Sequence, residues 1–193
     1  ALALAFDMVD EAQRPALTKR LVEAIRRFKG HPSTGIQTTH RMMLELSRNG
    51  QHEEAYRLAT LETVPSWGGM VKMGATTIWE RWDGYVKGRG PHRSGMNSFN
   101  HWALGSVGEW MWRNLVGINP DDSQPGYKHI VIRPRPAGDL TWAKGRYNSI
   151  RGPIESDWKI ADGRFTLRVV VPANTTATVY VPTRQADQVT EGG

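Results

Sequence analysis

The pattern of apolar residues changes once along this chain of 193 residues, close to Gly117. Up to that point apolar side chains recur at helical spacing in four stretches, residues 15–28, 38–49, 53–61 and 98–116. Beyond it they alternate with polar side chains, as in strands that bury one face. This order predicts an α+β chain of two domains, a helical domain at residues 1–117 and a β domain at residues 118–193.

The β domain carries a strong hairpin signal. Two alternating stretches, residues 154–160 and 165–171, flank the dipeptide Asp162-Gly163. Asp-Gly favours the tight turn that joins two antiparallel strands. Three further strands are expected, at residues 129–134, 140–150 and 175–181. Together these strands predict an antiparallel β module.

The helical domain contains a helical hairpin followed by a long connection. The short link at residues 49–52 makes the helices on either side of it antiparallel neighbours. Residues 62–97 are rich in Gly, Thr, Trp and charge, and they fit no clean helix. Because long ordered connections commonly carry function, this region is the first place to look for a site.

The composition excludes several kinds of partner. Lys and Arg number 25 against 19 Asp and Glu, but the basic residues are scattered, so no nucleic-acid partner is expected. No run reaches the roughly 18 apolar residues of a membrane span, so no membrane partner is expected either. The chain has no cysteine and its 6 histidines lack metal-site spacing, which predicts neither a metal nor a cofactor.

Tryptophan is concentrated in the second half of the helical domain. Six of the 8 tryptophans lie there, namely Trp67, Trp79, Trp82, Trp102, Trp110 and Trp112. They are interleaved with carboxylate, amide and imidazole side chains. Indole has an apolar face and one N–H donor, which suits a sugar ring, while the polar side chains suit its hydroxyls. A tryptophan-rich core is the alternative.

Glu80 lies between two of these tryptophans, Trp79 and Trp82, with Arg81 beside it. A carboxylate walled by aromatic rings is suited to act as a general base on water. The alternative is an ordinary surface ion pair between Glu80 and Arg81.

Asn100 and His101 lie at the start of the helix expected over residues 98–116. Both side chains are suited to hydrogen-bond sugar hydroxyls. The alternative is that this segment supplies a helix cap and one core histidine.

Four motifs bring these residues together: PSWG at residues 65–68, GATTIWERWDG at 74–84, SFNHWALGSVGEWMWRNLVGI at 98–118 and PGYKHIVIRPRP at 125–136. In this order the chain, over about residues 1–182, resembles the C-terminal part of bacterial α-L-rhamnosidases of glycoside hydrolase family 78. The resemblance implies the end of an (α/α)6 barrel followed by a β-sandwich. It also implies removal of terminal α-linked L-rhamnose, with inversion, from rhamnose-containing glycosides or polysaccharides.

The resemblance also implies roles for single residues. Glu80 corresponds to the general base that activates water, His101 to a residue that contacts the bound rhamnose, and Trp67, Trp79 and Trp82 to the wall of the sugar subsite.

An inverting glycosidase needs a second carboxyl group as its acid, and in this family the acid lies upstream. About 117 helical residues are also too few for twelve helices of roughly 11–12 residues each. The chain is therefore expected to be a C-terminal fragment whose partner is the N-terminal remainder of the same enzyme, and to be inactive or weakly active alone.

Two other functions remain open at this point. The chain could be a non-catalytic carbohydrate-binding module, with Trp142 and Trp158 of the β domain as its sugar platform. It could also belong to another inverting (α/α)6 glycosidase that acts on a different sugar, because a fold alone does not select the substrate.

Overall fold

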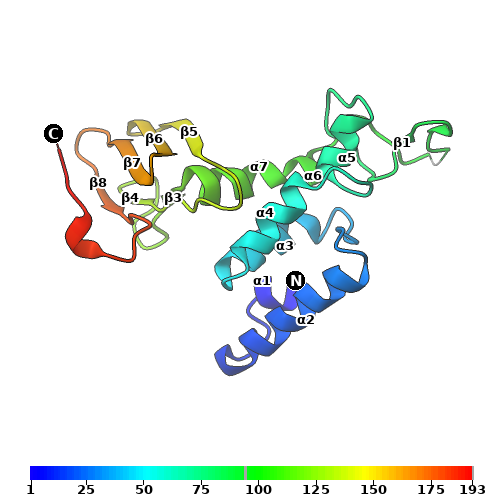
Figure 1. Cartoon of the computed structure of the whole chain (residues 1–193), viewed down its shortest axis with the longest axis horizontal. Coiled ribbons are helices and arrows are strands. Elements are labelled where there is room, and N and C mark those ends of the chain that lie inside the picture. Colours follow the sequence, from blue (N-terminus) through cyan, green and yellow to red (C-terminus); the bar gives the residue numbers. More distant parts are fainter. Residues whose placement is uncertain (94, 193) are drawn as a thin grey trace. The chain divides into compact units, whose positions relative to one another are not determined.

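A computed structural model describes residues 1–93 and 95–192. The chain divides into two compact units, Ala1–Trp110 and Met111–Gly193, and each unit is described by itself. The first unit is helical, coloured blue to green in Figure 1, and the second is built of strands. Gly193, the last residue of the predicted β domain, lies outside the described residues. No helix in the described ranges has the length and apolar character that a membrane span requires.

The helical unit contains seven α-helices in its described part. They are α1 (Leu2–Ala5), α2 (Arg14–Arg27), α3 (Thr39–Arg48), α4 (His52–Thr60), α5 (Trp67–Lys72), α6 (Trp102–Gly105) and α7 (Val107–Trp110). The predicted helices at residues 15–28, 38–49 and 53–61 correspond to α2, α3 and α4. Helix α5 lies in the connection for which no helix was expected. Its Gly68 and Gly69 weaken the helical pattern, and Ser66 caps it by accepting a hydrogen bond from the N–H of Gly69 at 2.8 Å.

Helix α3 forms the centre of this unit. It packs against α1, α4, α6 and α7, and it buries Met42, Met43 and Leu46. Trp110 of α7 is fully buried, and its indole N–H donates to the hydroxyl of Ser47 in α3 at 2.7 Å. Figure 1 shows α3 and α4 side by side, as expected for a helical hairpin with a short link.

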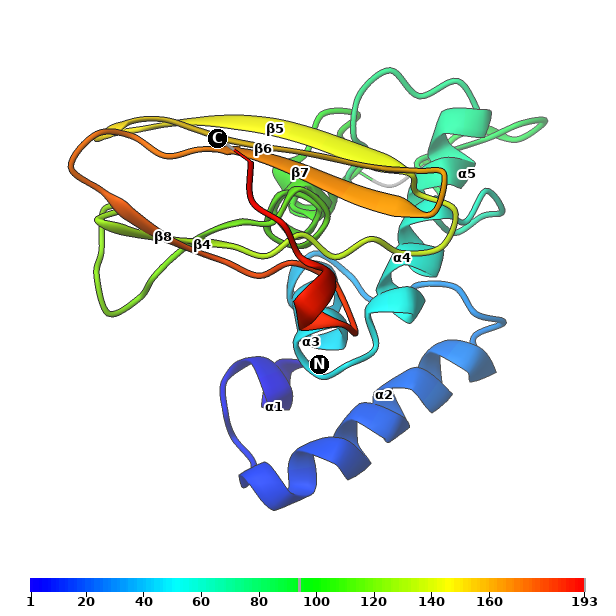
Figure 2. The ribbon, with the colours of Figure 1, turned by 60° about the vertical axis from the view of Figure 1, so that its left-hand side comes forward.

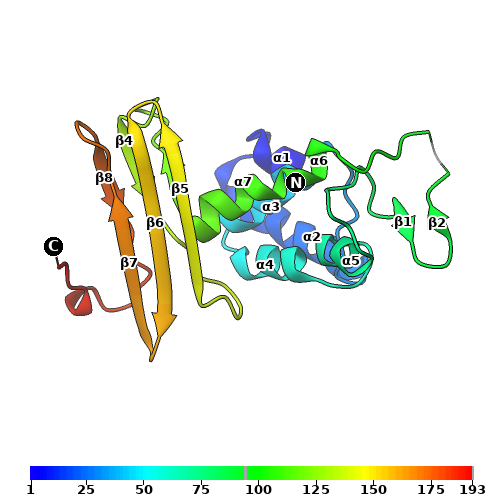
Figure 3. The same ribbon diagram turned by 90° about the horizontal axis from the view of Figure 1, so that it is seen from above.

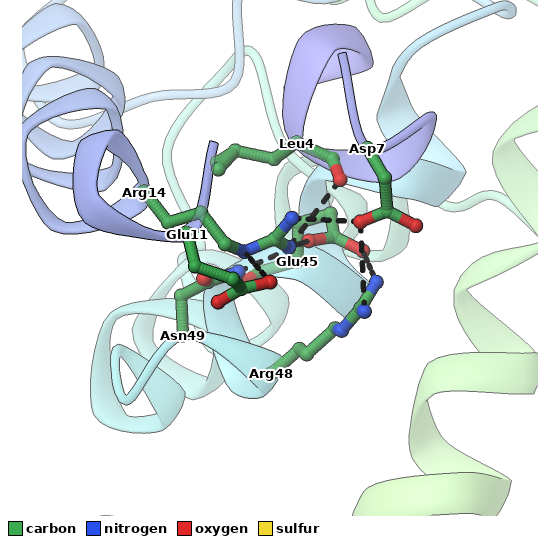
Figure 4. Close-up of polar contacts among 7 residues, drawn as sticks. All are labelled: Leu4, Asp7, Glu11, Arg14, Glu45, Arg48 and Asn49. Atoms are coloured by element: carbon green, nitrogen blue, oxygen red, sulfur yellow. Dashed lines mark hydrogen bonds and ion pairs between the residues drawn. The ribbon is translucent and has the colours of Figure 1, made fainter. Parts of the chain in front are cut away.

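The start of the unit is attached to α3 by a buried ion pair. Arg14 is 5% exposed and Glu45 is 6% exposed, and their side chains lie 3.2 Å apart. Arg14 also donates to Asp7 at 2.7 Å, and Figure 4 shows how these carboxylates surround its guanidinium group. A buried charge is tolerated only when it is paired and hydrogen-bonded. The contacts therefore link α1, α2 and α3.

The helix expected over residues 98–116 begins later than predicted and is interrupted. Residues 98–101 lie outside the helix, with a bend at residues 99 and 100, and this segment hydrogen-bonds to the chain around Glu80. Helix α6 starts at Trp102, and residues 111–116 form a π-helical segment in the second unit. Before α6, the two-residue strands β1 (Tyr85–Val86) and β2 (Gly90–Pro91) form a small antiparallel hairpin.

In its described residues, the second unit holds two three-stranded sheets. One has the order β3-β4-β8, and the other has the order β5-β6-β7. Their bounds are β3 (Ile118–Pro120), β4 (His129–Ile132), β5 (Trp142–Ser149), β6 (Gly152–Ala161), β7 (Arg164–Val170) and β8 (Thr176–Val179). Figures 2 and 3 show the two sheets as separate layers, and Val116, Ile118, Ile130, Ile132 and Ile154 form a core between them.

The structure confirms the predicted hairpin. Strands β6 and β7 are antiparallel, and Asp162 and Gly163 form the turn with φ of 51° and 72°. Positive φ at both central residues is what this class of tight turn requires. One pair departs from the antiparallel expectation, because β8 runs parallel to β4. After β7 the chain crosses to the other sheet and enters β8. The alternation of apolar and polar residues does not indicate whether a strand runs parallel or antiparallel to its neighbour.

Candidate active site

Two segments that are distant in sequence are joined by hydrogen bonds at the candidate site. The N–H of Glu80 donates to the carbonyl of Ser98 at 2.8 Å, and the N–H of His101 donates to the carbonyl of Ile78 at 2.9 Å. The hydroxyl of Thr77 donates to the carbonyl of Phe99. Residues 77–80 and 98–101 therefore lie alongside each other, and Glu80 and His101 belong to one local structure.

The carboxylate of Glu80 is held at one oxygen. The N–H of Ser98 donates to Glu80 Oε2 at 2.8 Å, so Ser98 contacts both the main chain and the side chain of Glu80. Within residues 1–93 and 95–192, Oε1 has no hydrogen-bond partner and the carboxylate forms no ion pair. A carboxylate fixed at one oxygen and open at the other can take a proton from a water molecule.

Arg81 does not pair with Glu80 but with Asp83, at 3.2 Å. Asp83 also faces Arg89 at 3.3 Å and His92 at 3.5 Å. Partial burial raises the pKa of Asp83, but the hydrogen bond and charge of Arg81, followed by the charge of His92, outweigh burial and leave this pKa below its usual value. The surface pair between Glu80 and Arg81, considered above as an alternative, is therefore not formed.

His101 caps helix α6. Its Nδ1 accepts a hydrogen bond from the N–H of Ala103 at 3.2 Å. Nδ1 must be unprotonated to accept, so in the neutral ring the proton is on Nε2. Nε2 has no partner among the described residues and is available to donate to a ligand hydroxyl.

The three tryptophans predicted to line a sugar subsite differ in burial, and two of them are in ring contact. Trp67 is 6% exposed and Trp79 is 5% exposed, whereas Trp82 is half-buried. The rings of Trp67 and Trp82 meet edge to face, with centroids 4.9 Å apart. The indole N–H of Trp67 donates to the carbonyl of Leu104, and that of Trp82 to the carbonyl of Thr34, each at 2.9 Å.

The remaining predicted residue, Asn100, is exposed, and its backbone N–H donates to the hydroxyl of Ser98 at 3.2 Å. One residue that contacts Glu80, Ser98, was not predicted from the sequence, and Trp102 was predicted only as one of the six clustered tryptophans. Ser98 acts through its backbone N–H, which no residue type signals. Trp102 is 77% exposed beside His101, and its membership of the tryptophan cluster was the only sequence signal available for it.

In the β unit, the two tryptophans suggested as a sugar platform differ in their exposure. Trp158 is fully buried, and its indole N–H donates to the carbonyl of Leu115 at 2.7 Å. It presents no face to a ligand, so its assignment to a sugar platform is wrong. Trp142 is exposed at the start of β5. Among the residues that the structure describes, no group of three or more potential ligands is arranged to hold a metal ion.

Two protein-family models match the chain, one over most of each unit. Residues 1–115 match the model of the bacterial alpha-L-rhamnosidase 6 hairpin glycosidase domain, and residues 117–193 match that of the bacterial alpha-L-rhamnosidase C-terminal domain. The chain belongs to the bacterial α-L-rhamnosidase family. The resemblance noted from the sequence motifs is thereby confirmed, together with the six-hairpin and C-terminal domain types that it implied.

Individual α-L-rhamnosidases are similar over nearly the whole chain. The chain is 44% identical to an alpha-L-rhamnosidase of Streptomyces avermitilis over 97% of its own length and 18% of that protein. It is 41% identical to an alpha-L-rhamnosidase of Formosa agariphila, over 96% of the chain and 20% of that protein. The chain thus spans about a fifth of the length of these α-L-rhamnosidases.

Solved structures of α-L-rhamnosidases have the same fold over this region. The crystal structure of the Streptomyces avermitilis enzyme complexed with L-rhamnose matches with a TM-score of 0.92 at 43% identity, over 97% of this chain and 18% of that one. The native enzyme of Aspergillus terreus matches with a TM-score of 0.87 at 36% identity, over 95% of this chain and 21% of that one.

Proposed function

We propose that this chain provides the water-activating side of the active site in a longer α-L-rhamnosidase. That enzyme hydrolyses terminal α-linked L-rhamnose from rhamnosides or rhamnose-containing polysaccharides with inversion. In the proposed division, residues 1–117 belong to the catalytic barrel and residues 118–193 to the C-terminal β domain. The observation that carries the proposal is the carboxylate of Glu80, which the N–H of Ser98 holds at one oxygen only.

In the proposed reaction Glu80 takes a proton from a water molecule as that water attacks the anomeric carbon. An acid on the opposite face of the sugar protonates the departing oxygen, and the configuration inverts. The Nε2–H of His101 donates to a sugar hydroxyl, and Asn100 is positioned to contact another. Trp67, Trp79 and Trp82 line the subsite as the aromatic wall behind these polar groups.

The acid is proposed to come from outside the described residues. Asp83 is the carboxyl group nearest to Glu80 in the sequence, but its lowered pKa keeps it ionised and unsuited to donate a proton. Glu109 hydrogen-bonds His40 at 2.5 Å, which commits it to a contact between α7 and α3. An upstream acid agrees with the chain spanning about a fifth of the length of its relatives.

Replacing Glu80 by Gln in the full-length enzyme tests the proposal. We expect kcat on nitrophenyl α-L-rhamnoside to fall by roughly 10²–10⁴-fold, because a general base contributes about that much, with binding of L-rhamnose retained. Glu62→Gln is a matched control, because Glu62 is exposed and pairs only with Lys72 in the described part of the chain. Wild-type turnover by the Glu80→Gln enzyme would refute the proposed base.

A further inference from the structure

We propose that Trp102 binds the apolar face of the sugar ring and is the stacking surface of this site. The inference rests on the proposed function, because it concerns the sugar that Glu80 and His101 are proposed to handle. It assigns the direct aromatic contact to a residue outside the three tryptophans that the family resemblance suggested.

The first step is that the three tryptophans suggested by the family resemblance make contacts within the protein. Trp67 and Trp79 are buried, and the centroid of the Trp79 ring lies 5.5 Å from that of Phe99, edge to face. The indole N–H groups of Trp67 and Trp82 already donate to backbone carbonyls. Trp67 and Trp79 therefore support the site from inside the unit and leave little ring surface for a sugar, while the half-buried Trp82 is held by its hydrogen bond and by its edge-to-face contact with Trp67.

The second step is that the side chain of Trp102 is mostly exposed and its indole N–H is not used within the described part of the protein. It is the most exposed of the large hydrophobic side chains in the helical unit, and its indole N–H has no hydrogen-bond partner within the described ranges. An exposed indole loses the free energy that burying its large apolar surface would provide. Tryptophan is enriched at interfaces, where its apolar ring and its N–H donor can both find partners.

The third step is the arrangement of Trp102 against His101. The two rings are stacked, with an interplanar angle of 18° and centroids 6.2 Å apart. The imidazole ring is fixed by its cap on Ala103, so it orients the neighbouring indole as well as its own Nε2–H. An apolar face, an indole N–H and an imidazole N–H thus lie together at the first turn of α6.

This combination suits a deoxyhexose. The ring C–H groups and the C5-methyl group of L-rhamnose form an apolar surface that packs on the indole face. Its hydroxyls are acceptors for the two unpartnered N–H donors. No charged group is needed in this recognition, so binding through Trp102 should depend little on salt.

The experiment uses the full-length enzyme carrying Glu80→Gln, so that binding is measured without turnover. The dissociation constant of L-rhamnose is determined by calorimetry after adding Trp102→Ala or Trp102→Phe. We expect Trp102→Ala to weaken binding by about tenfold or more and Trp102→Phe by less than about threefold, because phenylalanine keeps an aromatic face. Trp142→Ala, which removes another exposed tryptophan, is the matched control and should leave binding unchanged.

Packing against another part of the longer enzyme would give a different result. In that case Trp102→Ala lowers the melting temperature while the affinity for L-rhamnose is retained, and the inference is overturned. Unchanged affinity and unchanged melting temperature overturn it equally. Failure of the proposed function is distinguishable, because it appears as turnover by Glu80→Gln whether or not Trp102→Ala weakens L-rhamnose binding.

Discussion

At the scale of single residues, His101 has two separable roles. Its Nδ1 caps helix α6 in the structure, and its Nε2–H is proposed to donate to the sugar, so one side chain is proposed to serve both stability and binding. The sequence motif indicated Glu80 and His101 as candidates, and hydrogen bonds join the two segments that carry them. The motif could not reveal that Trp67 and Trp82 donate to carbonyls of Leu104 and Thr34, because those partners are remote in sequence and only the fold brings them close.

Two substitutions of His101 separate these roles. Asparagine is a good N-cap but lacks the Nε2–H, so His101→Asn should keep the stability of the enzyme and weaken its binding of L-rhamnose. His101→Ala should lose binding and also about 1 kcal/mol of stability, because an unfilled cap costs roughly that much. Thermal melts and calorimetry on the same preparations provide both measurements. Full affinity in His101→Asn would exclude the Nε2–H as a sugar contact.

At the scale of elements, turn chemistry was predictable and strand direction was not. The Asp162-Gly163 dipeptide specified the β6–β7 hairpin through its two positive φ angles. The parallel pairing of β4 and β8 depends on a crossing between sheets, which leaves no local trace in the sequence. Helix α5 was missed because its glycines carry no apolar pattern, although the capping side chain of Ser66 was present in the sequence.

The stability of the segment around the β1–β2 hairpin should depend on pH through the carboxyl group of Asp83. Because the pKa of Asp83 is lower in the folded protein, its stabilising contribution is present above the pKa of the unfolded carboxyl, about 4. This contribution is lost as pH falls through the lower folded pKa. Asp83→Asn should therefore destabilise the protein near neutral pH by at most about 1 kcal/mol, since the side chain is more than a third exposed.

Urea denaturation at neutral pH and again near pH 2.5 measures this dependence, and the difference between wild type and Asp83→Asn should shrink in acid. Asp10→Asn is the control, because the Asp10 side chain is exposed and has no partner in the described structure. A difference that stays constant with pH would assign the effect of Asp83→Asn to something other than its charge.

The contacts between α1, α2 and α3 depend on Glu45. Glu45→Ala leaves the buried guanidinium of Arg14 with Asp7 at 2.7 Å and with longer contacts to the carbonyl of Leu4 and to Glu11. It should cost about 3 kcal/mol, the lower end for breaking a buried pair. Replacing both members of the pair, with Arg14→Met and Glu45→Leu, should recover most of the loss. The free energy of unfolding from denaturant titration measures both variants. A loss under about 0.5 kcal/mol for Glu45→Ala, as expected for an exposed pair, would contradict this account.

At the scale of the whole molecule, the proposal places the base, Glu80, within the described residues and assigns the acid to neither of the two carboxyl groups considered beside it. Glu80 is open at one oxygen, whereas Asp83 is kept ionised and Glu109 is paired with His40. Inversion needs both groups on opposite faces of one sugar. The proposed division of the two carboxyl groups agrees with the chain spanning about a fifth of the length of its relatives.

The chain of 193 residues by itself is therefore expected to turn over nitrophenyl α-L-rhamnoside at least about 10²-fold more slowly than the full-length enzyme, because an absent general acid costs at least that much. Release of nitrophenol, followed with equal molar amounts of both proteins, measures the ratio. Background hydrolysis is separated by the Glu80→Gln form of the short chain. Rapid turnover by the short chain that disappears in this variant would mean that the acid lies within these residues, and the proposed division of the two carboxyl groups would have to be abandoned.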